Sequence, residues 1–240
     1  MAEKLIKSAD RVKDVGEVFT PKKIVNLMLD QPEITAKINN LHATFLEPSA
    51  GEGAFLVELL KRKLHVAMKM SKSARTFNMN SLIALSTLYG IEYMEDNVEM
   101  LVMNMISTFN REYESIMREK YDSKANRHVE DSAKVIIQAN MQQGDTLKQI
   151  TSTGEPIIFS EWHDLGRGKV QRTEYTFESI INQDGPTGRV KNSYEQLDLF
   201  AEPESEDGAP DKKVSYAPCK WAEIELKKII SNKNPYEEYQ

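Results

Sequence analysis

The sequence has little cysteine, and its few histidines form no group. The single cysteine, Cys219, excludes a framework of disulfide bonds within the chain. No apolar run is long enough to span a bilayer and no signal peptide is visible, so we expect a cytoplasmic protein that does not enter a membrane. The histidines lack the spacing of metal ligands, and we predict no metal site; they are His42, His65, His128 and His163.

The acidic residues are unevenly distributed. The formal net charge is −6, but residues 195–211 hold seven acidic and no basic residues, which leaves +1 for the rest of the chain. A length of 240 residues with 40% hydrophobic residues is typical of one α/β domain with a tail. Basic residues suited either to phosphate contacts or to a merely solvated loop precede this acidic stretch; they are Arg167, Lys169, Arg172, Arg189 and Lys191.

A glycine-rich loop is the most informative feature. Residues 44–56 run from an apolar stretch through Glu47-Pro48 to Gly51 and Gly53, after which we expect a helix. Glycine lets the backbone turn sharply and lie against a ligand where a Cβ would collide. A G-x-G sequence alone is weak evidence, because plain turns use it as well.

Further elements of an α/β unit follow this loop. The apolar run 82–91 is typical of a strand ending at Glu92, and residues 97–109 have helical periodicity. Residues 62–81 are expected to form an additional helical segment. A third strand is predicted at residues 135–139, before Gly144-Asp145-Thr146-Leu147.

Together with Gly16-Glu17-Val18-Phe19-Thr20-Pro21, these segments resemble the class I S-adenosylmethionine (AdoMet)-dependent N6-adenine DNA methyltransferases of restriction-modification systems. The resemblance covers roughly residues 14–150. It implies an α/β fold with a Rossmann-like, doubly wound sheet, and AdoMet as the cofactor. The cofactor-binding residues that it implies are Phe19, Thr20, Pro21, Glu47, Pro48, Gly51, Gly53, Phe55, Glu92 and Asp145.

The resemblance assigns a role to each acid, and two of these acids have alternatives. Glu47 would accept from the ammonium group of AdoMet, Glu92 from its ribose hydroxyls, and Asp145 from its adenine amino group. The alternative for Glu92 is a solvated acid at a helix start, and the alternative for Asp145 is a Gly-Asp turn. Glu47 and Glu92 also lie farther apart than the roughly 20 residues of a minimal unit.

The expected catalytic motif is divergent. After the fourth strand, N6-adenine enzymes carry [DNS]-P-P-[YFW], which holds the target amino group and stacks on the flipped base. Here residues 156–159 are followed by Ser160-Glu161-Trp162, without either proline. We predict these three as catalytic residues: Ser160 replaces the first polar residue, Glu161 is a candidate acceptor for an exocyclic amine, and Trp162 offers a stacking face. Asn234-Pro235-Tyr236 follows an expected helix, and we interpret it as a chance match.

A second motif lies in the acidic stretch. Gln196-Leu197-Asp198-Leu199-Phe200 resembles the Q-L-[SD]-L-F peptide with which bacterial replication and repair proteins bind the DNA polymerase sliding clamp. A small strand packed on the core is the alternative. We therefore predict a methyltransferase domain over residues 1–190, an acidic flexible linker over 191–215, and a C-terminal helix over 216–240 that is amphipathic between residues 218 and 231.

Two functions follow from this interpretation. The first is an AdoMet-dependent methyltransferase that acts on DNA, at adenine N6, and lacks a large target-recognition domain, so that a specificity subunit or the clamp would supply targeting. The alternative is a catalytically inactive protein of the methyltransferase fold that binds DNA, the clamp or a partner subunit.

Overall fold

The computed structural model describes residues 7 and 8, 10 and 11, 13, 18–182, 214–226, and 230 and 231. Several sequence predictions fall outside these residues. They concern Gly16 and Glu17, the clamp-like peptide at 196–200 with nearly all of the linker, and Asn234-Pro235-Tyr236.

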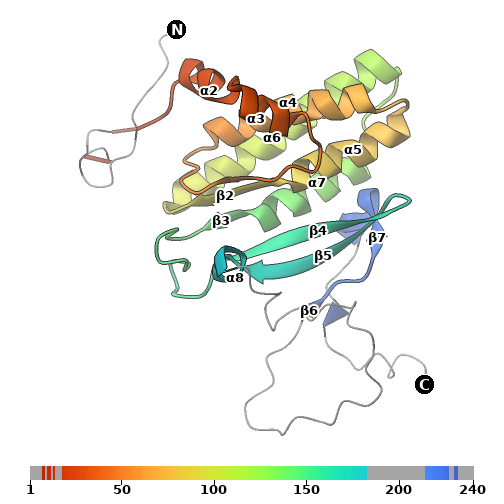
Figure 1. Cartoon of the computed structure of the whole chain (residues 1–240). Helices are drawn as coiled ribbons and strands as arrows, with labels where there is room; N and C mark the ends of the chain where they lie inside the picture. The colour runs from red at the N-terminus through yellow and green to blue at the C-terminus, as the bar shows by residue number, and fades with distance from the viewer. Residues whose placement is uncertain are drawn as a thin grey trace, which may run out of the picture.

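A parallel sheet forms the centre of the fold. Its strands are β1 (Phe45–Glu47), β2 (Leu88–Glu92) and β3 (Met141–Gln143), in the order β1-β2-β3. Phe45 lies opposite Leu88, and Glu92 lies opposite Gln143. Because parallel strands end at the same edge of a sheet, the loops that follow β1, β2 and β3 meet there (Figure 1). This arrangement is compatible with the predicted α/β methyltransferase fold.

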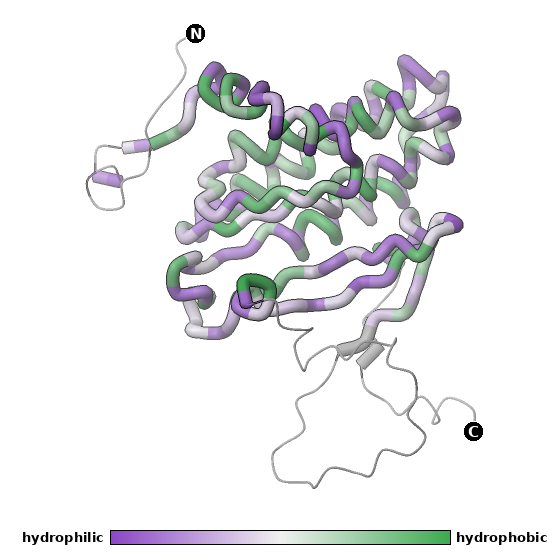
Figure 2. The backbone as a smooth tube through the Cα atoms, in the orientation of Figure 1, coloured by the Kyte–Doolittle hydropathy of each residue, from purple (hydrophilic) through white to green (hydrophobic). Residues whose placement is uncertain are grey.

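Helices pack against this sheet and against one another (Figure 1). The bounds are α2 (Lys22–Leu29), α3 (Pro32–Ile38), α4 (Ala54–Met70), α5 (Ala74–Ser86), α6 (Glu95–Tyr121) and α7 (Arg127–Asn140). Figure 2 shows hydrophobic segments along these helices and the parallel strands, whereas much of the later β-structure is hydrophilic. The helix expected after the glycine loop is α4, the segment 62–81 is helical apart from the break between α4 and α5, and the helix expected at 97–109 is part of α6.

Local chemistry fixes where α5 begins and how it packs. The Ser73 hydroxyl accepts from the Thr76 backbone N–H at 3.3 Å, and the Thr76 hydroxyl accepts in return from the Ser73 N–H at 3.1 Å. This capping box satisfies two backbone donors at the start of the helix. Within the helix, Phe77 is fully buried and stacks on Tyr113 of α6, with ring centroids 5.7 Å apart.

A second, antiparallel sheet lies beside the parallel one. Its strands are β4 (Ile158–Gly166), β5 (Lys169–Thr176) and β7 (Cys219–Lys220), in the order β4-β5-β7. It is followed by the 3₁₀-helix η1 (Trp221–Leu226), and the short helix α8 (Phe177–Asn182) extends β5. A further two-stranded pair joins β6 (Val214–Ser215) to β8 (Ile230–Ser231). The Tyr89 hydroxyl of β2 donates to the Ser160 carbonyl of β4 at 2.9 Å, which fastens the two sheets together.

The structure corrects the predicted positions of two strands. Residues 135–139 lie within α7, and the first half of the run 82–91 belongs to α5. Short apolar runs have the same appearance in a buried strand and on a buried helix face, so periodicity alone does not separate them. Val129, Ala133 and Ile137 are all buried, and their spacing of four residues is that of a helix.

The fourth strand and the C-terminal helix also differ from expectation. β4 pairs in antiparallel fashion with β5, and within the described residues it does not extend the parallel sheet. Among the described residues between 218 and 231, the structure has β7, η1 and β8 in place of an amphipathic α-helix. Trp221 and Ile224 are buried and lie three residues apart. A 3₁₀-helix has three residues per turn, so it places both side chains on the same face. No helix in the described ranges is both long and apolar enough to cross a membrane.

Candidate cofactor site

A cavity of about 690 Å³ lies at the carboxyl ends of the parallel strands. We name it the cofactor cavity. The loops after β1, β2 and β3 all contribute to its wall, together with the residues just before α2. Its lining residues are Val18, Phe19, Pro48, Ser49, Gly51, Glu92, Tyr93, Met94, Asn97, Gly144, Asp145, Thr146 and Leu147.

Glu92 joins the loops at the base of this cavity. Glu92 is buried, with only 7% of its surface exposed. The Oε2 atom accepts from the Gly51 N–H at 2.8 Å, and the Oε1 atom accepts from the Met94 N–H at 3.0 Å and from Asn97 Nδ2 at 3.3 Å. A carboxylate that accepts several N–H groups is held in place by charge-assisted hydrogen bonds. Glu92 therefore ties the glycine loop to the start of α6.

The two glycines of the loop have different surroundings. Gly51 has φ +54°, and a Cβ there would meet no atom within 4 Å, so its free side faces open space at the cavity. Gly53 has φ +93°, and a Cβ there would lie 2.5 Å from Leu101 Cδ1 of α6. Gly51 thus keeps room beside the cavity, whereas Gly53 allows α4 to begin against α6.

The loop after β3 closes the opposite wall. Asp145 Oδ1 accepts from the N–H groups of Leu147 at 3.0 Å and Lys148 at 3.1 Å, and Lys148 Nζ lies 3.2 Å from Oδ2. These contacts with Lys148 and Leu147 lower the pKa of the Asp145 carboxyl. The Thr146 hydroxyl donates to the Pro48 carbonyl at 2.6 Å. Asp145 is therefore a turn-forming acid as well as a residue of the cavity wall.

The other predicted cofactor residues lie near the cavity but not in its wall. Glu47 ends β1, and burial raises the pKa of its carboxyl, which accepts a long 3.4 Å hydrogen bond from Ser49 N–H. The Pro21 carbonyl accepts from Ile24 and Val25 at the start of α2. Of the cofactor residues predicted, the structure brings Phe19, Pro48, Gly51, Glu92 and Asp145 into the wall, and it leaves out Thr20, Pro21, Glu47, Gly53 and Phe55.

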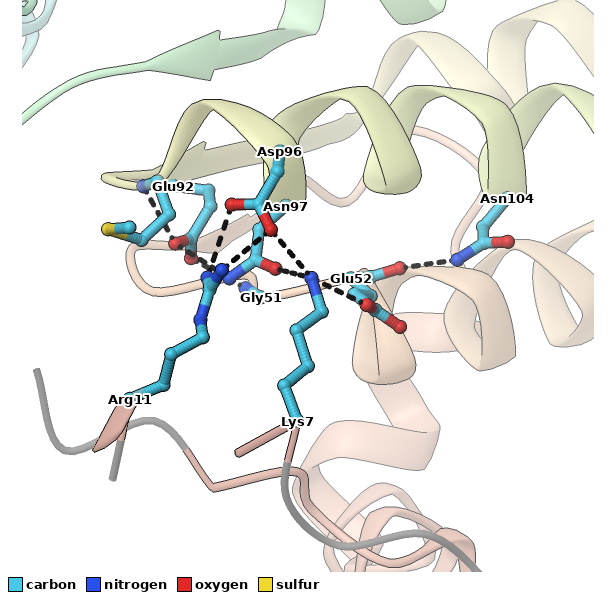
Figure 3. Close-up of polar contacts among 9 residues, drawn as sticks. Lys7, Arg11, Gly51, Glu52, Glu92, Asp96, Asn97 and Asn104 are labelled. Atoms are coloured by element: carbon cyan, nitrogen blue, oxygen red, sulfur yellow. Dashed lines mark hydrogen bonds and ion pairs between the residues drawn. The ribbon is translucent and has the colours of Figure 1, made fainter. Parts of the chain in front are cut away.

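Basic residues near the N-terminus reach the edge of this site (Figure 3). Arg11 Nη1 lies 2.7 Å from Asp96 Oδ2, and Lys7 Nζ lies 2.9 Å from Glu52 Oε1 and 3.0 Å from Asp96. Arg11 and Lys7 lower the pKa of the Asp96 carboxyl to about 2. Lys7 also donates to Asn97, which lines the cavity. These contacts could not be predicted, because nothing in the sequence links residues so far apart.

The predicted catalytic residues do not lie in the wall of the cofactor cavity. Ser160 and Glu161 line a separate cavity of about 360 Å³ beside β1, which we name the aromatic cavity because Tyr89, Phe159, Tyr175 and Phe177 line it as well. Ser160 Oγ is buried and accepts from Arg172 Nε at 2.7 Å. Glu161 is exposed, and its Oε2 lies 3.1 Å from His163 Nε2.

Trp162 is a packed residue of the core. It is 9% exposed, and its Nε1 donates to Asn140 Oδ1 of α7 at 3.1 Å. The Arg172 guanidinium lies 5.4 Å from the centre of its ring, a cation–π distance. The ring therefore already has neighbours where a stacked base would need a free face.

No group of three or more His, Cys, Asp or Glu side chains that could hold a metal ion occurs in the part of the chain that the structure describes. Neither the curated proteins nor the solved structures compared with the chain gave a match. The family model for N-6 DNA methylase matches residues 3–190, which is well over half of the sequence and includes all three strands of the parallel sheet. The chain therefore belongs to the N-6 DNA methylase family.

Proposed function

We propose that this protein binds AdoMet in the cofactor cavity and acts in the methylation of DNA at adenine N6. The observation that carries the proposal is that the loops after β1, β2 and β3 converge on one cavity, where the Glu92 carboxylate joins the first two loops and its backbone carbonyl accepts from Gly144 in the third. In open α/β sheets, ligands bind at the carboxyl ends of the strands. Membership of the N-6 DNA methylase family supports the same cofactor and substrate.

The size and the chemistry of the cavity suit this cofactor. Its volume of about 690 Å³ is in the range of small-molecule sites. Glu92 Oε2 accepts one backbone N–H and retains a second lone pair for a ribose hydroxyl. The open space beside Gly51 leaves room for a ligand against the backbone. Bound AdoMet supplies an activated methyl group on its sulfonium sulfur.

Glu161 is the residue we propose to face an acceptor base. It lies at the aromatic cavity, where rings of Tyr89, Phe159 and Tyr175 offer apolar faces and its carboxylate is an acceptor for an exocyclic amine. Burial, together with the hydrogen bond to Glu161, raises the pKa of Tyr175 to about 12, so this phenol stays protonated at neutral pH. The burial of Trp162 and its hydrogen bond to Asn140 support a packing role for this residue.

Binding of AdoMet is tested by calorimetry on the full chain. Gly51→Val should abolish binding, because its side chain would fill the space at the cavity wall. Gly154→Val is the matched control, since Gly154 also has a left-handed φ, of +84°, with open space around it, but does not line the cofactor cavity. Wild-type protein that gives no heat and no thermal shift with AdoMet, S-adenosylhomocysteine or sinefungin would refute the proposal.

A second candidate function is AdoMet binding without methyl transfer by this chain alone. The buried ring of Trp162 favours it, because the expected base-stacking side chain is not free. Labelled AdoMet, incubated with single- and double-stranded DNA, separates the two functions once the DNA is digested to nucleosides. N6-methyladenine formed by the wild type and lost in Glu161→Gln supports the first function. AdoMet binding without any product supports the second.

A further inference from the structure

A second polar cavity lies at the turn of the β4–β5 hairpin. It has a volume of about 570 Å³ and is formed by the first turns of α5, the hairpin turn and the junction of β7 with η1. We name it the basic cavity. It shares no lining residue with the cofactor cavity, and in Figure 1 the hairpin turn and the arrowhead of β2 lie on opposite sides of the view. A ligand bound there would not be the cofactor.

Three cationic side chains from separate elements line this cavity. Arg75 comes from the first turn of α5, Arg167 from the hairpin turn, and Lys220 from the end of β7. Within the described ranges, neither arginine has an ion pair or a side-chain hydrogen bond. Lys220 Nζ lies 2.9 Å from Glu223. The acid in the wall is Asp164, whose Oδ1 accepts from the Gly166 N–H at 2.9 Å. The cavity wall therefore has an excess of positive charge.

Arg167 occupies a position that its side chain does not favour. Residues 167 and 168 form the two-residue turn of the hairpin, with φ of +52° and +78°. Turns with two left-handed residues favour Asn, Asp or Gly, because these tolerate that backbone conformation. An arginine here adds strain to the fold without a partner that would offset it. A ligand contact is a physical reason for its presence.

Trp221 is a further lining residue of the same cavity. It is 2% exposed and lines the cavity, and its Nε1 finds no acceptor in the described part of the chain. A buried N–H without an acceptor is unfavourable, because the donor has lost its hydrogen bond to water. Arginine, lysine and the indole of tryptophan are donors with no acceptor capacity. A ligand that suits the three cationic side chains carries several acceptor oxygens and negative charge.

We infer that the basic cavity binds a phosphate group. Guanidinium groups match phosphate oxygens in geometry and charge, and their hydrogen bonds to phosphate are charge-assisted. The phosphate belongs either to a nucleic-acid backbone or to a free phosphate compound, and both sources present the same oxygens to Arg75, Arg167 and Lys220. The inference is independent of AdoMet binding, because the two cavities have separate walls.

The experiment is a titration of the full chain followed by NMR. The chain has two tryptophans, and Trp162→Phe identifies which indole N–H signal belongs to Trp221. Inorganic phosphate and a short DNA duplex are added separately at low ionic strength. We expect the Trp221 signal to shift on addition of one or both. A shift with the duplex assigns the phosphate to nucleic acid, and a shift with inorganic phosphate alone assigns it to free phosphate compounds.

Matched variants make the titration decisive. Arg75→Gln combined with Arg167→Asn should weaken phosphate binding at least tenfold, and asparagine fits the left-handed turn, so the fold is retained. Arg111→Gln is the control, since Arg111 is exposed, pairs with its neighbour Glu112 and lies outside the cavity wall. The inference is overturned if neither probe shifts the Trp221 signal. It is equally overturned if the double variant, with an unchanged melting temperature, binds phosphate as the wild type does.

Discussion

Glu92→Gln tests whether one carboxylate holds the cofactor cavity together. The wild-type side chain accepts from Gly51 N–H through one oxygen and from Met94 N–H and Asn97 through the other. Glutamine has a single acceptor oxygen, so its NH₂ group must face one of these donors. A hydrogen bond to a charged group contributes about 1.5–3 kcal/mol. We expect the free energy of unfolding to fall by about 2–3 kcal/mol.

AdoMet affinity should fall in the same variant. The ribose would lose a charged acceptor, and the glycine loop would lose its anchor, so we expect binding at least tenfold weaker, or about 1.4 kcal/mol. Urea denaturation measures stability and calorimetry measures binding. Glu99→Gln is the control, because Glu99 lies exposed on α6. Unfolding at the wild-type urea concentration together with wild-type AdoMet affinity would show that Glu92 is not the residue on which the site depends.

Three further changes test the packing around the site. Gly53→Ala should destabilise the fold by about 1–3 kcal/mol, because the new Cβ would lie 2.5 Å from Leu101 Cδ1 and the backbone there is left-handed. Thermal unfolding measures this loss of stability, and an unchanged melting temperature would contradict the prediction. Burial lowers the pKa of Lys63 from 10.5 to about 8, so between these pH values the unfolded chain binds more protons than the folded chain. The free energy of unfolding should therefore rise with pH in this range. Urea denaturation at pH 8 and pH 9 should show this rise in the wild type and not in Lys63→Met. Trp162→Phe should cost about 1–3 kcal/mol by leaving Asn140 Oδ1 without its donor, while AdoMet affinity stays unchanged; a loss of affinity would place Trp162 at the cofactor.

The sequence predicted the central α/β unit best where local chemistry is specific. The glycine loop is followed by α4, the predicted strand end at Glu92 is the end of β2, and helix α6 follows it. Residues 135–139 were misassigned, because an apolar run next to a three-residue strand carries no period that distinguishes it from a buried helix face. The hairpin was missed although Gly166-Arg167-Gly168 between polar, alternating segments is typical of a tight turn.

The site was predictable in part. The motifs indicated Gly51, Glu92 and Asp145, and the structure brings these three to one cavity. Asn97 and Thr146 were missed, since an asparagine in a helix and a threonine in a turn carry no signal of their own. Their contacts, Asn97 with Glu92 and Thr146 with the Pro48 carbonyl, arise only when the loops meet.

The hydrogen bonds between these loops bear on how a ligand would enter. Glu92 accepts from Gly51, the Glu92 carbonyl accepts from the Gly144 N–H at 3.0 Å, and Thr146 donates to Pro48, so hydrogen bonds within the chain join the three loops. A preorganised wall has little backbone entropy left to lose on association. The cofactor cavity is therefore a preorganised site. The affinity for AdoMet should depend on direct contacts more than on the entropic cost of ordering the loops.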